Sequence, residues 1–199
     1  ASITNILTLR YDPSIKPNLP KKTWNNFKPL VGEPSIEFIE KLIEKTIQKQ
    51  LDISSIKKIC IALSGGIDSA LILTLIKKTV PDIQVDAISI KFANSIDETG
   101  SASKIAARLE ANHHIIYVEN YLCELPKAIS IIKLPFWDLH WYYVAKKSQS
   151  ISKYLASGDG GDELFGGYTF RYKKFLSLTN VKSTPLEKAK AYLLCHERD

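Results

Sequence analysis

Residues 58–76 read KICIALSGGIDSALILTLI, and this stretch decides the fold. Its first part, Lys58–Leu63, is a short apolar run of the length of a buried strand. Ser64-Gly65-Gly66 interrupt the run, and glycines allow the backbone to turn sharply. The apolar residues of Ala70–Ile76 then recur at helical spacing. The stretch therefore predicts a buried strand, a tight glycine turn and a helix, in that order.

The rest of the chain continues this alternation of strands and helices. We expect one helix after Ser35, with a buried apolar face, and a second that opens at a capping box formed by Ser95 and Glu98. Further strands are expected at 84–91, 114–118 and 153–156, and further helices at 122–132, 139–152 and in the last thirty or so residues, where Thr184, Pro185 and Glu187 form a helix start. Such alternation predicts an α/β fold with a doubly wound, mostly parallel sheet, whose ligands bind beyond the carboxyl ends of the strands.

Composition and charge exclude several classes of protein. The 199 residues are 45% hydrophobic, which is typical of a globular domain. No apolar run is long enough to span a bilayer, and the N-terminus lacks the pattern of a secretory signal. Three cysteines fit neither a zinc pattern nor a disulfide framework. We therefore expect a cytoplasmic protein without a membrane partner.

The formal net charge of +6 arises from lysines scattered along the chain. Nucleic-acid binding usually concentrates basic residues on one face or tract. Nucleic acid is therefore not the expected partner, and small molecules are.

The first 34 residues differ in composition from the rest. They are rich in proline and asparagine and carry the aromatic residues Tyr11, Trp24 and Phe27. This pattern predicts an extended arm over residues 1–34, packed on the surface of a domain that comprises residues 35–199.

The glycine turn, Ser64-Gly65-Gly66-Ile67-Asp68-Ser69, has the composition of an anion-binding loop. Backbone N–H groups of the turn and of the following helix point outward, and the helix dipole favours negative charge there. Ser64 and Ser69 add hydroxyl donors. The loop is not a Walker A motif, because it lacks the Gly-Lys-Ser/Thr sequence. Asp68 would repel a bare phosphate, so we expect Mg²⁺ between them.

Two motifs resemble a known family. The strand, SGGIDS loop and helix resemble the pyrophosphate loop (PP-loop) of the ATP pyrophosphatases, which cleave ATP between the α and β phosphates. Residues 157–168, SGDGGDELFGGY, are similar to the SGEGxDExFGGY segment of asparagine synthetases and β-lactam synthetases. The resemblance covers residues 36–168 and identifies the synthetase domain of the asparagine synthetase family.

The resemblance implies an adenine nucleotide alpha hydrolase-like (PP-loop ATPase) fold and a set of site residues. It implies that ATP is bound by Ala62 and Ile90 at the adenine, by Ser157 and Gly158 around the nucleotide, and by Ser64, Gly65, Gly66 and Ser69 at the pyrophosphate. It further implies that Asp68 and Asp162 bind Mg²⁺ and that Asp159 acts near the nucleophile. The implied reaction is adenylation of a carboxylate, most simply the aspartate side chain, followed by transfer to ammonia with release of AMP and pyrophosphate.

The chain departs from the family pattern at several points. Asp159 stands where the family has glutamate. The aspartate side chain is one methylene shorter, so its carboxylate lies closer to the backbone. Leu139 and His140 replace small hydroxyl residues in an aromatic stretch, residues 136–143, which we expect either to line the acceptor pocket or to pack as an ordinary helix. No glutaminase domain precedes the loop, so ammonia is expected from solution or from a separate glutaminase subunit, and a homo-oligomer is equally open. The family's later catalytic lysine is not visible, so we expect the domain to continue past residue 199.

Two alternatives remain open from the residues. A tRNA-modifying enzyme with the same loop would suit the basic charge, but such enzymes generally lack a segment like SGDGGDELFGGY. A non-catalytic nucleotide-binding subunit would suit Asp159, whereas intact Asp68 and Asp162 favour an enzyme.

Overall fold

The computed structural model describes residues 35–51, 56–93, 95–133 and 138–196 of the chain. The arm predicted for residues 1–34 lies outside these ranges. The chain divides into two compact units at Ser157–Gly158. Each unit is therefore described by itself.

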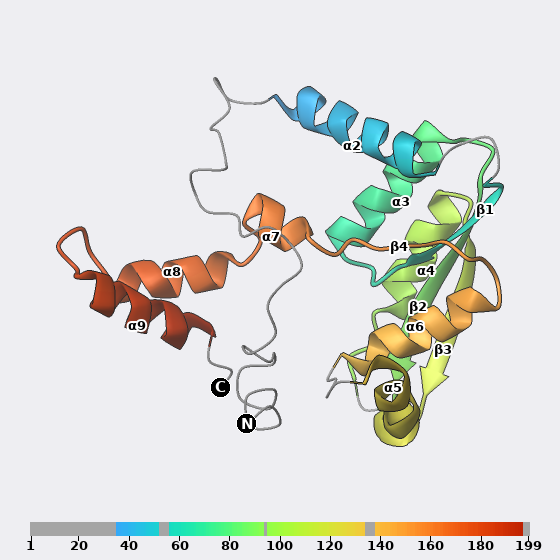
Figure 1. Ribbon diagram of the computed structural model, residues 1–199. Helices are drawn as coiled ribbons and strands as arrows, with labels where there is room; N and C mark the ends of the chain where they lie inside the picture. Colours follow the sequence, from blue (N-terminus) through green and yellow to red (C-terminus); the bar gives the residue numbers. More distant parts are fainter. Residues whose placement is uncertain (1–34, 52–55, 94, 134–137, 197–199) are drawn as a thin grey trace. The chain divides into compact units, whose positions relative to one another are not determined.

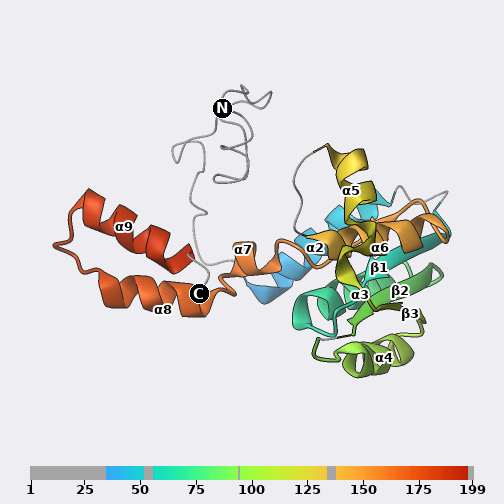
Figure 2. The same cartoon turned by 90° about the horizontal axis from the view of Figure 1, so that it is seen from below.

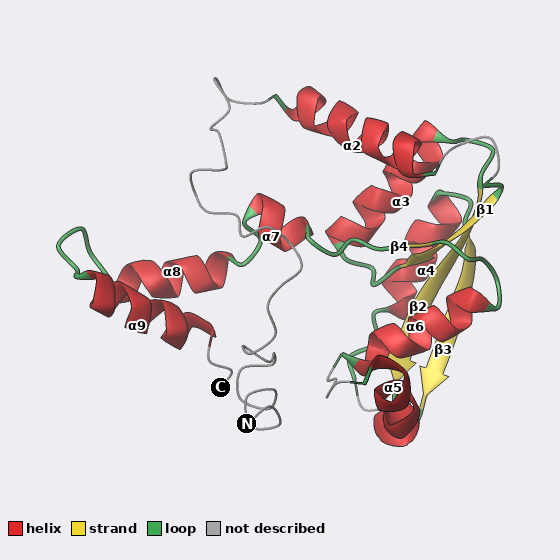
Figure 3. Cartoon of the chain, in the orientation of Figure 1, coloured by secondary structure: helices red, strands yellow, loops and turns green. Residues whose placement is uncertain are grey.

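The first unit is built on a four-stranded sheet (Figure 3). Its strands are β1 (Lys58–Ala62), β2 (Gln84–Phe92), β3 (Asn112–Val118) and β4 (Leu155–Ala156), in the spatial order β3-β2-β1-β4. Every neighbouring pair is parallel. This confirms the predicted parallel sheet of an α/β protein.

Helices cover both faces of the sheet, as a doubly wound fold requires (Figure 2). On one face lie α3 (Ile67–Thr79) and α4 (Thr99–Arg108), which share a core with β1 and β2. On the other face lies α6 (Leu139–Gln149), whose Val144 packs with Cys60 and Ile88. The helices α2 (Ile36–Gln50) and α5 (Leu125–Ile132) and the 3₁₀ turn η2 (Tyr121–Glu124) complete the unit.

Two local predictions for helices of this unit need correction. The predicted α2 is present, but its apolar face is buried only in part: Ile47 packs against the core, whereas Ile36 is 80% exposed. The capping box expected at Ser95 does not form, and α4 begins only at Thr99. There the Asp97 carboxylate accepts hydrogen bonds from the Thr99 amide (3.0 Å) and hydroxyl (2.6 Å). Asp97 thus forms a local turn just before the helix, whereas Glu98 is the N-cap residue and makes no side-chain capping bond.

The second unit contains three helices (orange and red in Figure 1). They are α7 (Gly161–Phe165), α8 (Thr169–Leu178) and α9 (Pro185–His196). The predicted capping box of α9 is confirmed, because the Thr184 amide donates to Glu187 (2.7 Å) and the Glu187 amide donates to the Thr184 hydroxyl (3.3 Å). Among the described residues of this unit, only Ala191 and Cys195 are buried.

The topology of the sheet determines where a ligand can bind. The chain runs from β1 outward through β2 to β3, then returns to place β4 on the other side of β1. The strand order therefore reverses between β1 and β4, and crevices of doubly wound sheets open at the carboxyl ends of such a pair.

None of the described helices combines the length and the apolar character needed to cross a bilayer.

Candidate nucleotide-binding site

The glycine loop follows β1 at this reversal point. Gly65 has a φ of +85°, and a side chain added there would come within 3.2 Å of the Glu98 carbonyl oxygen and 3.3 Å of the Ala102 amide nitrogen. Only glycine combines the left-handed backbone with so close an approach. The loop therefore turns against the N-terminal end of α4.

The two serines of the loop hold its shape from within. The Ser64 amide donates to the Ser69 hydroxyl oxygen (3.3 Å), and the two hydroxyl oxygens lie 3.2 Å apart. Ser69 in turn donates to the Gly66 carbonyl (3.2 Å), while the Gly66 amide donates to the Ser64 hydroxyl oxygen (3.2 Å). These bonds close a ring that joins the end of β1 to the start of α3.

The first turn of α3 leaves backbone donors for a ligand. Its N-cap is Gly66, which makes no side-chain capping bond. The first N–H groups of a helix have no acceptor within the helix, so those of Ile67, Asp68 and Ser69 point out of this end. Together with the helix dipole they can bind an anion. Within the described residues, Asp68 makes no hydrogen bond or ion pair, so its half-buried carboxylate is available.

The strand β4 brings a second predicted residue to the same edge. In the β1–β4 register Ile61 faces Ala156, so Ser157 follows β4 where the chain leaves β1 for the loop. The structure thus brings Ser157 and the loop to the carboxyl edge of one sheet. Gly158 begins the second unit.

The residues predicted to hold adenine lie on neighbouring strands. Ala62 ends β1, and its partner in the β1–β2 register is Ile88. Ile90 lies two residues further along β2. Their side chains pack in the core beneath α6, together with Trp141. A role in binding adenine would therefore fall to their backbone, and this role stays a prediction.

The second motif folds around the short helix α7. Gly160 and Gly166 adopt left-handed conformations, with φ of +92° and +70°, and bracket the helix. Asp159 is exposed just before it, and Asp162 lies in its first turn. The glycines of this motif are therefore needed to start and stop one turn of helix.

Gly167 has a different role, which the sequence reasoning missed. A side chain added there would come within 1.7 Å of a carboxylate oxygen of Asp162. The Asp162 carboxylate thus occupies the space that any other residue at position 167 would fill. The double glycine, Gly166-Gly167, was the available signal: one glycine suffices for a turn, and the second indicates close approach by another group.

A cluster of side chains fixes the end of the motif. Tyr168 donates to Glu163 (2.8 Å), and the Arg171 guanidinium lies 4.4 Å from the centre of the Tyr168 ring. The bond from Tyr168 lowers the pKa of Glu163 and raises that of Tyr168. Arg171 thus stacks on the ring of Tyr168.

The two predicted metal ligands are both carboxylates at the start of a helix. Asp68 belongs to the first unit and Asp162 to the second, so their joint coordination of Mg²⁺ stays a prediction. No group of three or more His, Cys, Asp or Glu side chains gathers among the described residues.

The aromatic stretch after residue 135 is described from Asp138 onward. Leu139 is fully buried, and its amide donates to the Tyr121 hydroxyl (2.8 Å). The hydroxyl of Tyr142 donates to Glu124 (3.2 Å), and that of Tyr143 donates to the Tyr121 carbonyl (3.1 Å). These contacts favour the packing interpretation of the stretch over the acceptor pocket.

A parallel sheet with a glycine turn and an uncapped helix at its reversal point is the architecture of α/β proteins of the PP-loop type. Residues 39–197 match the family described as asparagine synthase, and the chain belongs to this family.

The curated relatives are longer than this chain. Asparagine synthetase [glutamine-hydrolyzing] 1 of Bacillus subtilis is 30% identical over 167 residues, which are 80% of this chain and 26% of that protein. A putative asparagine synthetase [glutamine-hydrolyzing] 2 of Methanocaldococcus jannaschii is 32% identical over 111 residues, 53% of this chain and 22% of that protein. The chain thus spans about a quarter of the length of these relatives.

Solved structures support the fold. The glutamine-dependent NAD⁺ synthetase of Acinetobacter baumannii, solved with ADP, aligns with a TM-score of 0.52 at 16% identity, over 71% of this chain and 29% of that one. The NMN synthetase of Francisella tularensis aligns with a TM-score of 0.50 at 20% identity, over 67% of this chain and 58% of that one. Both likenesses show the α/β fold of the PP-loop proteins.

Proposed function

We propose that this chain binds ATP and activates a carboxylate as the acyl-adenylate, within an ATP-dependent amide ligase. The observation that carries the proposal is the loop between β1 and α3, with its outward amides, its paired hydroxyls and an Asp68 that has no partner within the described residues. Membership of the asparagine synthase family supports the same chemistry.

The reaction follows from the groups at the loop. A carboxylate oxygen attacks the α-phosphorus in line, and the bond from this phosphorus to the oxygen that bridges the α and β phosphates breaks. Amides of Gly65 and of the first turn of α3, with the hydroxyls of Ser64 and Ser69, would hold the pyrophosphate as its charge develops. An amine nitrogen then attacks the acyl carbon, loses a proton and displaces AMP.

Asp68 and Asp162 would hold Mg²⁺, and both supply the oxygen ligands that this ion prefers. The ion, when bound, neutralises phosphate charge that Asp68 would otherwise repel. Ser157 and Gly158, together with the backbone of Ala62 and Ile90, would surround the nucleoside.

The finer identity of the substrates is part of the proposal. We propose aspartate as the carboxylate and ammonia as the amine, with asparagine as the product, because the curated relatives are named asparagine synthetases. Asp159 is proposed as the group near the nucleophile. Its carboxylate is one methylene shorter than the family's glutamate, so the attacking amine or the carboxylate must sit closer to the backbone than in the family.

The test is pyrophosphate release from ATP and Mg²⁺ over a panel of amino-acid carboxylates with ammonia. Asp68→Ala removes a proposed metal ligand and should lower release on the order of a hundredfold, the size of effect that one charge-stabilising group carries. Asp82→Ala is the matched control, because Asp82 is exposed beyond the opposite end of α3. It should release pyrophosphate as the wild type does.

Other results would redirect the proposal. Equal release by Asp68→Ala and the wild type would show that the metal assignment is wrong. ATP binding without release for any carboxylate would favour a nucleotide-binding subunit. Release with a carboxylate other than aspartate would keep the ligase and replace the substrate.

A further inference from the structure

A chain of hydrogen-bonded side chains, which we call the relay, links Ser103, His113 and Ser89 to the residue before the glycine loop. The sequence analysis did not assign these residues to the site. Ser103 on α4 lies 2.9 Å from Nδ1 of His113 on β3. Nε2 of the same ring lies 2.8 Å from the hydroxyl of Ser89 on β2, which donates to the Leu63 carbonyl oxygen (2.6 Å). The relay therefore joins three elements to the residue that precedes the loop.

The directions of these bonds follow from the number of available protons. The one hydroxyl proton of Ser89 goes to the Leu63 carbonyl, so the Ser89 oxygen must accept from Nε2–H of His113. In the neutral ring Nδ1 is then an acceptor, and Ser103 donates to it. Burial lowers the pKa of His113, which agrees with a neutral ring.

The relay ends where the loop begins. Leu63 is buried, and its amide donates to the Ile88 carbonyl (2.9 Å), so both of its backbone polar groups are fixed by β2. Gly65, two residues on, turns against the first turn of α4, the helix that also carries Ser103. His113 thus contacts Ser89, which binds the Leu63 carbonyl, and Ser103, which lies on the helix that Gly65 packs against.

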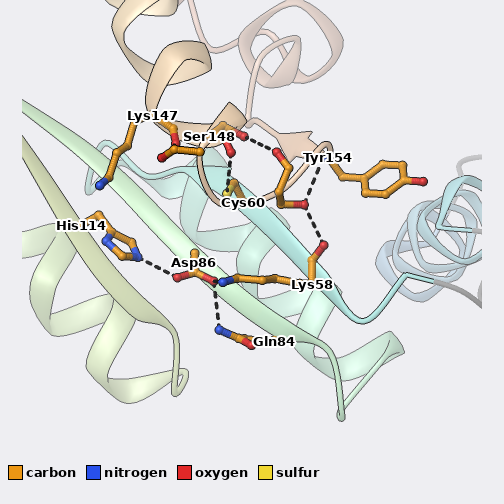
Figure 4. A network of polar contacts seen from close by, with 10 residues as sticks. Lys58, Cys60, Gln84, Asp86, His114, Lys147, Ser148 and Tyr154 are labelled. Atoms are coloured by element: carbon orange, nitrogen blue, oxygen red, sulfur yellow. Dashed lines mark hydrogen bonds and ion pairs between the residues drawn. The ribbon is translucent and has the colours of Figure 1, made fainter.

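The neighbouring His114 provides a contrast on the same strand. Its side chain lies on the other face of the sheet, where Nε2 contacts Asp86 at 2.7 Å and Lys58 contacts the same carboxylate at 3.4 Å (Figure 4). In the β1–β2 register Asp86 faces Cys60, three residues before Leu63. The two histidines are similarly half-buried, but only His113 is linked to the loop.

We propose that His113 is a positioning residue for the phosphate-binding loop, acting through Ser89 on the Leu63 carbonyl. The inference rests on the proposed function, because it assigns a support to the loop that would hold the pyrophosphate. Outer partners of this kind orient the groups that contact a ligand, and at metal centres their removal weakens binding roughly 10–100-fold.

The test compares His113→Leu with His113→Gln and with His114→Leu as the matched control. The measurements are the dissociation constant for ATP with Mg²⁺ by calorimetry, the KM for ATP in the pyrophosphate assay, and the melting temperature. His113→Leu should weaken ATP binding by about tenfold and raise the KM for ATP without a matching change in the KM for the carboxylate. His113→Gln, whose amide N–H can replace Nε2–H, should restore most of the affinity. His114→Leu should lower the melting temperature and leave ATP affinity unchanged.

Each remaining outcome decides whether His113 positions the loop. If the wild type binds ATP and His113→Leu binds it equally well, the inference is overturned and the proposed function stands. Equal weakening by His114→Leu would also overturn it, because a general loss of stability would then explain both variants. If the wild type itself binds no ATP, the proposed function fails and the inference falls with it. If His113→Leu does not fold, Ser89→Ala, which removes the donor to the Leu63 carbonyl, takes its place with the same expected weakening.

Discussion

Gly65 is the residue at which backbone and packing most constrain the loop. Its φ of +85° disfavours any side chain, and a Cβ would lie 3.2 Å from the Glu98 carbonyl oxygen. We predict that Gly65→Ala lowers the free energy of unfolding by about 1–2 kcal/mol from the left-handed conformation alone. Because the loop must also shift away from α4, ATP affinity should fall in the same variant. Urea unfolding and calorimetry with ATP and Mg²⁺ measure the two effects.

Gly100→Ala is the control for this prediction. Gly100 lies in the first turns of α4, and a Cβ there would meet no atom within 4 Å. Alanine is the better helix former, so this variant should be as stable as the wild type or slightly more stable. If Gly65→Ala proves as stable as Gly100→Ala, the packing of the loop against α4 is not what requires glycine.

The residue scale also shows where the sequence was informative. The loop, from Ser64 to Ser69, could be predicted because its glycines and hydroxyls are consecutive and their geometry is local. The relay through His113 could not, since Ser103 is brought to it by helix packing and Ser89 by strand register. Contacts of this kind depend on tertiary structure, and no spacing in the sequence records them.

At the scale of elements, apolar runs and glycine turns predicted the strands well and the helix starts less well. β1, β2 and β3 lie within two residues of their predicted positions. β1 and β2 are buried along most of their length, and a parallel strand buried on both faces is a continuous apolar run. The predicted start of α4 was wrong because the Ser95 hydroxyl donates to the Phe92 and Ile96 carbonyls, and the helix begins only after the turn that Asp97 forms with Thr99. β4 is shorter than predicted, since only two of its residues pair with β1.

His113, which lies in β3, should make the free energy of unfolding depend on pH. Burial, and to a lesser degree the charge of His114, lowers its pKa in the folded protein from 6.5. The unfolded chain then binds more protons as the pH falls below about 6.5, so the free energy of unfolding decreases with falling pH. The stabilising contribution is complete above that pH and is lost as the pH falls through the lowered value.

Urea unfolding between about pH 8 and pH 5 measures this dependence. His113→Gln cannot titrate but retains His114, so its stability should fall less steeply over the same range. Identical slopes in the two proteins would mean that the His113 ring is no harder to protonate in the fold than in the unfolded chain.

At the scale of the whole molecule, the two compact units differ in how much they bury. The first contains two apolar clusters on opposite faces of the sheet. In the second, Ala191 and Cys195 are the buried residues among those described. The sequence predicted one domain over residues 35–199, because helical spacing marks α8 and α9 as helices but does not tell how deeply either is buried.

This difference predicts unequal protection from hydrogen exchange. α4 and α8 have the same length of 10 residues, but α4 buries Thr99, Ala102 and Ala106, whereas α8 buries none of its residues. Because local opening is resisted chiefly by buried apolar contacts, amides of α8 should exchange on the order of tenfold or more faster than those of α4. Exchange of this chain at neutral pH, read out by peptide mass spectrometry, measures both helices in one sample. Equal protection of α8 and α4 would show that the second unit is held as firmly as the sheet, and that burial within each unit does not set its stability.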